Sequence, residues 1–431
     1  MKLNKKNTIL IGFAFLSITA FWQMYDNMVP LILTNTFNMN KTISGLIMAA
    51  DNILALFLLP LFGTLSDKSN FRMGKRKPFI LFGTIAAVVF MTGLPLLDNS
   101  YYASPSPLKT AGFIIILGLL LIAMGTYRSP AVALMPDVTP RPLRSKGNAI
   151  INLMGAIGGI VYLLASSVLF SKKKTAGLDH VNYMPIFIVV AIIMLASLAI
   201  LLFFVNEPKL RAKQAEYEKA HPEEELTVEE NTTQKKVMPK SVKLSLLFLL
   251  LSVALWYIGY NAVNTWFTTY ATNVWNMALG DASMCLTIAM AGAIISYIPV
   301  GVLAGKIGRK ISILIGAGLL AVCFFAAYIY TIFSDSFHPI LYVLFVLIGI
   351  AWATINVNSF PMVVEMCAGA DVGKFTGYYY TFSMAAQTIT PVLAGTLLSK
   401  VGYNSLFPYA AIFVAASFLT MCFVKHGDSE K

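Results

Sequence analysis

Three charged residues, Asp26, Asp51 and Arg128, interrupt long apolar stretches in the first third of the chain. An ionised side chain at the centre of a membrane span costs about 2.5–3.5 kcal/mol by insertion scales, so such a group faces a cavity or a partner. A desolvated carboxylate takes up a proton more readily, whereas a nearby arginine opposes that uptake. The three residues therefore predict a proton-coupling site. A permanent Asp–Arg bridge that holds the spans together is the alternative.

Uncharged polar residues recur at helical spacing in the second half of the chain. Asn261, Asn264 and Thr265 share one helix face, and amides and hydroxyls can replace the water that a polyhydroxylated ligand loses on binding. Aromatic rings would add an apolar platform. Hydrogen bonding between helices is the alternative use of such residues in a membrane. The expected ligand contacts are Trp22, Asp26, Arg128, Asn261, Asn264, Thr265, Trp266, Asn358, Tyr380 and Gln387.

Membrane spans must position these residues, because only 12% of the 431 residues are charged and the mean hydropathy is +0.72. A soluble domain carries about 25% charged residues. Windows of about 20 apolar residues lie near 9–36, 43–65, 78–97, 109–136, 146–170, 183–205, 242–272, 282–304, 311–332, 339–364, 375–399 and 404–424. The sequence thus predicts an all-α membrane protein with twelve transmembrane helices in two six-helix bundles, 1–205 and 241–431.

The segment 206–240 joins the two predicted bundles and carries eight acidic and seven basic residues. Such a stretch cannot enter lipid, so we expect a solvated linker that is helical in part. Basic residues gather in alternate short loops, which predicts a multi-pass protein of the cell (inner) membrane with both termini and the linker in the cytoplasm. The basic loops that set this orientation therefore account for the net charge of +12, and nucleic-acid binding is excluded.

The same loop pattern follows the second span of each half. Residues 63–77 contain Gly-x-Leu-Ser-Asp and then Gly-Lys-Arg-Lys, whereas residues 301–310 contain Gly-x-Leu-Ala-Gly and then Gly-Arg-Lys. This repeat indicates a duplication, with two bundles facing each other across a cleft near the bilayer midplane. Charged residues at the inner ends of the spans are expected to form gating contacts between the two halves: Asp67, Arg76, Asp137, Arg144 and Glu365.

The segment GTLSDKSNFRMGKRKPFI, residues 63–80, resembles the span 2–3 signature of the major facilitator superfamily. Its long form, together with Pro130–Asp137, is similar to the sucrose/proton symporter and glycoside–pentoside–hexuronide:cation symporter branch. The resemblance implies cation-coupled symport of a sugar or glycoside by alternating access, with H⁺ or else Na⁺ as the ion. Leu121 stands where plant sucrose carriers have an acidic residue, which shifts the expected coupling role to Asp26 and Asp51.

The main alternative within this fold is a proton-driven exporter of drugs or other small organic solutes. The many amides and the membrane arginine favour a polar ligand instead. A membrane sensor or scaffold would need an appended signalling domain, which the sequence does not indicate. No histidine–cysteine ligand spacing, phosphate-binding glycine loop or nucleophile elbow is present, so we expect no enzymatic activity, metal site or cofactor. We expect a monomer.

Overall fold

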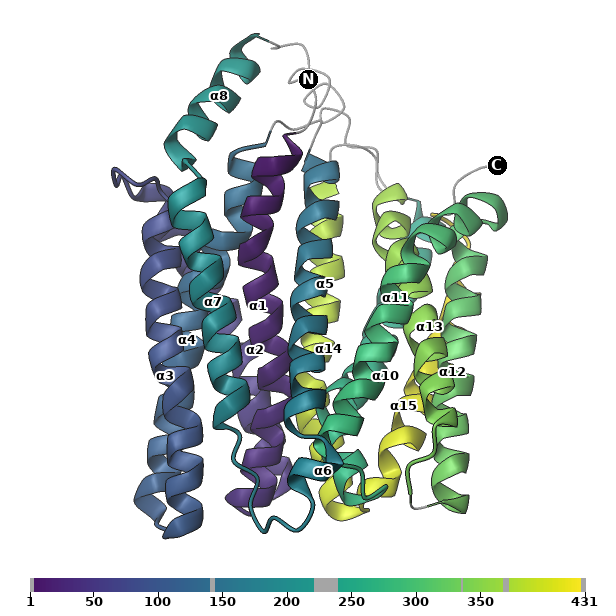
Figure 1. Ribbon diagram of the computed structural model, residues 1–431. Coiled ribbons are helices and arrows are strands. Elements are labelled where there is room, and N and C mark those ends of the chain that lie inside the picture. The colour runs from purple at the N-terminus through teal and green to yellow at the C-terminus, as the bar shows by residue number, and fades with distance from the viewer. Residues whose placement is uncertain (1–3, 140–143, 221–238, 335, 367–371, 428–431) are drawn as a thin grey trace. The chain divides into compact units, whose positions relative to one another are not determined.

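The computed structural model describes residues 4–139, 144–220, 239–334, 336–366 and 372–427, and every regular element among them is a helix (Figure 1). The chain divides into two compact units. The first comprises Met1–Met39 and Ala50–Pro222, and the second comprises Asn40–Ala49 and Glu223–Lys431. The predicted all-α fold is therefore confirmed.

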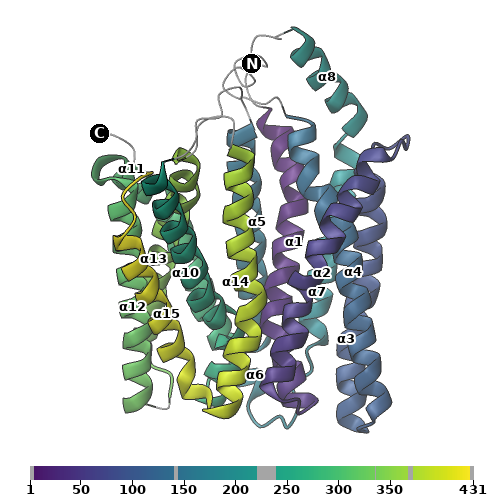
Figure 2. The ribbon, with the colours of Figure 1, turned by 180° about the vertical axis from the view of Figure 1, so that it is seen from behind.

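The first unit contains a kinked opening helix and six further helices, together with the part of α2 from residue 50 onwards. Its elements are α1 (Lys5–Leu31) with η1 (Ile32–Thr36), α2 (Lys41–Lys68), α3 (Lys77–Ala103), α4 (Pro107–Asp137), α5 (Arg144–Leu169), α6 (Lys172–Thr175), α7 (Met184–Phe204) and α8 (Glu207–Ala220). The helix α1 packs against α5 and α7, and α3 packs against α4 and α7 (Figure 2).

The second unit repeats this packing with its own helices. They are α10 (Lys240–Asn273), α11 (Leu279–Ile307), α12 (Arg309–Phe333), α13 (Ile340–Glu365), α14 (Val372–Lys400), η4 (Tyr403–Ser405) and α15 (Leu406–Cys422). Here α10 packs against α14 and α15, and α12 packs against α13 and α15. In both units the first long helix thus contacts the fifth and the sixth, and the third contacts the fourth and the sixth.

Glycines allow the closest helix pairs to form. A Cβ atom added at Gly158 of α5 would lie 2.0 Å from the Leu16 carbonyl oxygen of α1. In the second unit, a Cβ atom at Gly349 of α13 would lie 1.9 Å from the Ala289 carbonyl oxygen of α11. Small residues at such crossings let backbones approach closely, which is how helices associate in lipid without a hydrophobic driving force between them.

Eleven helices in the described part of the chain are long and apolar enough to cross a membrane. The remaining long helix, α14, has 29 residues but contains tyrosine, serine, threonine and glutamine along much of its length. At about 1.5 Å per residue it is long enough to span. It completes the twelve-helix, two-bundle fold that the sequence predicts.

Candidate functional site

A small cavity in the first unit is lined by three of the residues that the sequence identified. It has a volume of about 10 Å³, room for about one water molecule. The lining residues come from α1, α2 and α4: Trp22, Asp51, Ala55, Leu58, Leu59, Leu121, Gly125 and Arg128. A carboxylate, a guanidinium and an indole thus share a small pocket whose other lining side chains are aliphatic.

The charges around this cavity interact without forming a close ion pair. The Arg128 guanidinium carbon lies 5.4 Å from the centre of the Trp22 ring, a cation–π distance. Arg128 attracts the Asp51 carboxylate, while the half-buried Asp26 on α1 repels it. In the described part of the chain, Asp51 and Arg128 are not joined by an ion pair within 4 Å. Asp51 instead accepts a 2.9 Å hydrogen bond from the amide of Asn52.

The neighbours of Arg128 in sequence fix its direction. Tyr127 donates a 2.9 Å hydrogen bond to the carbonyl oxygen of Ala14 on α1, and it also bonds Ser17. On the other side of Arg128, the Ser129 hydroxyl donates a 2.7 Å bond to the Leu59 carbonyl oxygen of α2. These bonds attach α4 to both α1 and α2, so the arginine between them points into the space that the three helices enclose.

The uncharged candidates of the second unit differ in how accessible they are. The half-buried Asn261 of α10 has a buried Nδ2 with no hydrogen-bond partner in the described structure. The amide of Asn358 donates to the Thr354 carbonyl oxygen at 2.9 Å, and that of Gln387 donates to the Ser383 carbonyl oxygen at 3.3 Å.

Four further candidates of the second unit range from exposed to fully buried. Asn264 is half-buried, Thr265 is buried, and Tyr380 of α14 is 54% exposed. Trp266 is fully buried, and a Cβ atom added at Gly395 of α14 would lie 2.9 Å from its ring. The Trp266 ring therefore packs between helices in this structure and offers no face to a ligand.

The sequence reasoning missed the aromatic cluster on α10 and α13. The rings of Tyr260 and Trp352 are stacked, with centres 3.7 Å apart and planes 3° from parallel. The Tyr257 ring meets Trp352 edge-on at 5.4 Å. Trp352 lies in the middle of its span, one turn before Asn356. This spacing of an aromatic and an amide residue is the signal in the sequence that could have identified Trp352. This cluster, rather than Trp266, offers the second unit's aromatic surface.

Ionic junctions lie where the loop pattern repeats in each unit. Arg76 has a side chain only 6% exposed and binds the carboxylates of Asp67 and, at 2.8 Å, Asp137. In the second unit, Arg309 binds Glu365, and both side chains are partly exposed. Four of the five predicted gating residues thus form pairs within their own unit. The fifth, Arg144, begins α5, but its side chain lies outside the described part of the structure.

A buried glutamate, which the sequence did not single out, joins the first junction. Glu207 was assigned to a solvated linker, yet it is fully buried at the start of α8. Its carboxylate accepts hydrogen bonds of 2.7–3.1 Å from the backbone amides of Lys75, Arg76 and Lys77, where α3 begins. The prediction failed at this residue because composition cannot reveal a contact with a helix terminus 132 positions away.

Another missed carboxylate lies at the far end of α3. Asp98 is fully buried, and its Oδ2 is 3.5 Å from Nε2 of His180. His180 stacks on Tyr102 and bonds Asn99, and burial lowers the pKa of this histidine below its ordinary value. The apolar run ends at residue 97, whereas α3 continues to Ala103, so the sequence placed Asp98 in a loop.

Two similarly packed units of long apolar helices, with charged side chains inside the spans of the first, are typical of a polytopic membrane transporter. The sequence matches the Major Facilitator Superfamily over residues 11–277 and 249–431. The chain belongs to this family. It is a transporter and not an enzyme, as the fold and the family match both indicate.

Two proteins that are similar in sequence are named for different transported substrates. A sucrose transport protein of Oryza sativa subsp. indica is 28% identical over 193 residues, 39% of this chain and 38% of that protein. The alpha-ketoglutarate permease of Escherichia coli is 24% identical over 184 residues, 43% of this chain and 38% of that protein. The chain therefore matches less than two fifths of the length of either relative.

Solved structures share the fold over nearly the whole chain. A bacterial homologue of the iron transporter ferroportin, in an inward-facing state, has a TM-score of 0.70 at 12% identity and covers 98% of this chain and 99% of its own. The xylose transporter XylE from E. coli, in an inward open conformation, has a TM-score of 0.68 at 16% identity, covering 98% and 96%. At such identities the likeness shows the fold alone.

Proposed function

We propose that this transporter is a cation-coupled symporter, most simply with H⁺, for a sugar or glycoside, working by alternating access. The observation that carries the proposal is the cavity that places Asp51 and Arg128 against Trp22, with Asp26 beside it. The similarity of part of the chain to a sucrose transport protein supports a sugar as cargo. The proposal includes a place in the cell membrane with both termini in the cytoplasm, as the distribution of basic loops predicts.

Coupling would follow from competition for Arg128. While Asp51 is ionised, its attraction to Arg128 opposes protonation, and the repulsion from Asp26 favours it. A proton on Asp51 removes that repulsion and also ends the attraction between Asp51 and Arg128, so that the guanidinium charge is left for another partner. Substrate hydroxyl groups then accept hydrogen bonds from the guanidinium, so that proton binding and sugar binding favour each other. A sodium ion held by the same carboxylates is the other form of this proposal.

Neutral donors of the second unit are proposed as further ligand contacts. Asn261 has a buried N–H donor without a partner in the described structure, and leaving such a donor unpaired is unfavourable. The Tyr257–Trp352 pair supplies an aromatic surface of the kind that packs on the apolar face of a pyranose. Both features suit a ligand that is polar at its edge and apolar on its face.

Uptake by the purified protein in proteoliposomes tests the proposal. A panel of mono- and disaccharides is offered with an imposed pH gradient, with an imposed sodium gradient and with none. Gradient-driven accumulation of at least one sugar is expected, and the effective gradient identifies the ion. Accumulation of a dicarboxylate but of no sugar, or extrusion of a lipophilic cation, would overturn the assignment of the cargo.

A further inference from the structure

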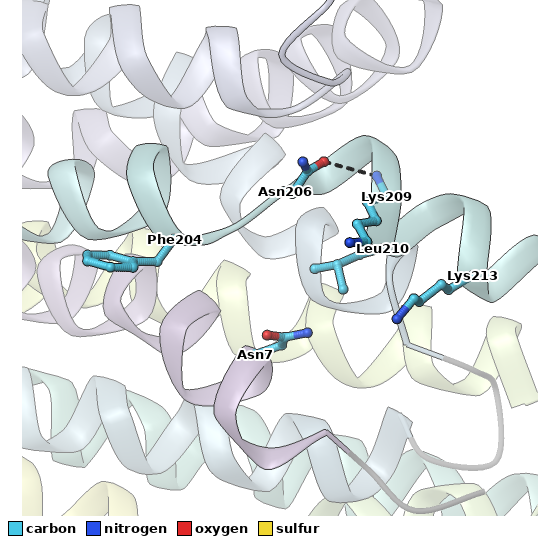
Figure 3. Close-up of a pocket in the computed structure, with 6 residues that line it drawn as sticks. All are labelled: Asn7, Phe204, Asn206, Lys209, Leu210 and Lys213. Carbon is cyan, nitrogen blue, oxygen red and sulfur yellow. Dashed lines mark hydrogen bonds between the residues drawn. The ribbon is translucent and has the colours of Figure 1, made fainter.

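A second, larger cavity lies in the first unit at the ends of two spans. It has a volume of about 220 Å³. Its lining residues come from the first turn of α1, the last residue of α7, the connection between α7 and α8, and the first two turns of α8. They are Asn7, Phe204, Asn206, Lys209, Leu210 and Lys213 (Figure 3). Nothing in the proposed transport cycle uses these residues.

Positive charge dominates this cavity. Lys209 and Lys213 lie one turn apart on α8, and neither forms an ion pair with a carboxylate in the part of the chain that the structure describes. The nearest acids on the same helix are Glu207 for Lys209 and Glu216 for Lys213. Glu207 is engaged by three backbone amides and lies 3.8 Å from Arg211, and Glu216 does not line the cavity. The first turn of α1 contains no acidic residue. The charge of the two lysines is therefore not neutralised by the cavity's own wall.

An apolar surface continues from the cavity onto the outside of the bundle. Phe204, which lines the cavity, is 68% exposed, and its neighbour Phe203 is 83% exposed. Both end the membrane span Met184–Phe204, the most hydrophobic span of the protein. The cavity thus lies at the depth where hydrocarbon gives way to headgroups, with lysines on one side and phenylalanine on the other.

We propose that this cavity binds the headgroup of an anionic phospholipid. The phosphate lies between Lys209 and Lys213, Asn7 and Asn206 contact the glycerol part, and the acyl chains run along Phe204 and the outer face of α7. A lipid uses both the charge and the exposed aromatic surface, whereas a soluble phosphate ester would use the charge alone. Figure 3 shows Lys213 extending from α8 towards the turn that carries Asn7.

The wall of the lipid site is held in place by the junction described above. Glu207 attaches the start of α8 to the start of α3, and the Asn206 side chain accepts a 3.1 Å bond from the Lys209 amide, which caps α8. Both lysines therefore project from a helix whose first turn is fixed. Bound lipid would in turn stabilise the docked position of α8, because a ligand stabilises the state that binds it.

Native mass spectrometry of the intact transporter tests the site. The protein is titrated with phosphatidylglycerol, with zwitterionic phosphatidylethanolamine and with water-soluble glycerol phosphate. We expect retained phosphatidylglycerol adducts, and an affinity about 30-fold lower in the Lys209→Gln/Lys213→Gln double variant, which corresponds to ~1 kcal/mol for each lysine. The matched control is Lys172→Gln/Lys173→Gln. It removes two exposed lysines from α6, at the opposite end of the first unit (Figure 1), and should keep the adduct.

Each other result contradicts the proposal. Equal binding of phosphatidylethanolamine would show that the lysines do not select an anion. Equal binding of glycerol phosphate, or its competition with lipid at similar concentration, would assign the cavity to a soluble anion. An unchanged affinity in the double variant would place the lipid elsewhere. All three readouts measure lipid binding and not transport. Their outcome therefore does not depend on whether the proposed cargo is correct.

Discussion

The two units have the same helix packing but place their charges differently. The first unit holds the half-buried Asp26, Asp51 and Arg128 within its spans, and it encloses Arg76 at one end. In the described part of the second unit, the mid-span polar groups are amides, hydroxyls and aromatic rings, and the corresponding ion pair, Arg309–Glu365, is partly exposed. The two units therefore share a pattern of helix packing, while the energetically costly groups are concentrated in the first unit.

From this contrast we hypothesise that the first unit couples the ion and that the second unit contributes neutral ligand contacts. Buried charges respond strongly to a change of protonation, because the low local dielectric magnifies every interaction with them. Neutral amides and rings bind polar ligands without such a response. The following predictions test the contrast, from the largest expected effect to the smallest.

Asp26→Asn and Asp51→Asn are expected to have the largest effect. Each removes a carboxylate that can carry the coupled proton, so gradient-driven accumulation should fall at least tenfold while exchange of labelled for unlabelled substrate continues. Asp281→Asn, in the first turn of α11, is the control in the second unit and should leave accumulation unchanged. Normal accumulation in both test variants would remove the coupling role from the first unit.

Arg76→Gln and Arg309→Gln compare the two junctions. Arg76 is 6% exposed and holds two carboxylates that are 62% and 23% exposed, so its loss should destabilise the protein by about 1.5–3 kcal/mol, the range for a hydrogen bond to a charged group. The partly exposed pair of Arg309 should contribute under about 1 kcal/mol. Thermal unfolding in detergent measures both. Equal shifts in melting temperature would show that the two junctions are equivalent.

Gly74→Ala and Gly308→Ala probe the glycine before each of these arginines. Both glycines have positive φ, 114° and 94°, and alanine there costs about 1–3 kcal/mol. Only at Gly74 would the new Cβ also lie 2.3 Å from Oε2 of Glu207. The Gly74 variant should therefore have the lower melting temperature of the two. A lower melting temperature for the Gly308 variant than for the Gly74 variant would contradict the docking of Glu207 at this turn.

Glu207→Gln should give a smaller loss, about 2 kcal/mol, because glutamine keeps one acceptor for the α3 amides but loses the charge. Glu216→Gln, on the exposed side of the same helix, is the matched control and should change the melting temperature little. Proteolysis of α8 offers a second readout. It should accelerate in the Glu207 variant alone, and equal rates in both variants would contradict the docking.

The local pattern of the sequence was a reliable guide to the spans and a partial guide to the site. Asp26, Asp51 and Arg128 were predicted to form a coupling site and Trp22 to contact the ligand. Asp51, Arg128 and Trp22 line one cavity in the structure, whereas Asp26 is not among its lining residues. Trp266 was expected to face a ligand on the strength of its residue type, yet it is packed against Gly395. Residue type predicts which groups are expensive to bury, but the rotation of a helix about its axis decides what they face.

The sequence by itself determined that twelve helices span a membrane and that the first half carries the charges. Lipid offers no hydrogen bonds to the backbone, so each span must satisfy its own and is visible in a single window of residues. Only the tertiary structure decided which of those charges meet, and that Glu207 binds amides at the start of α3. Such contacts depend on helix crossings set by packing between distant segments, and no local pattern of residues encodes them.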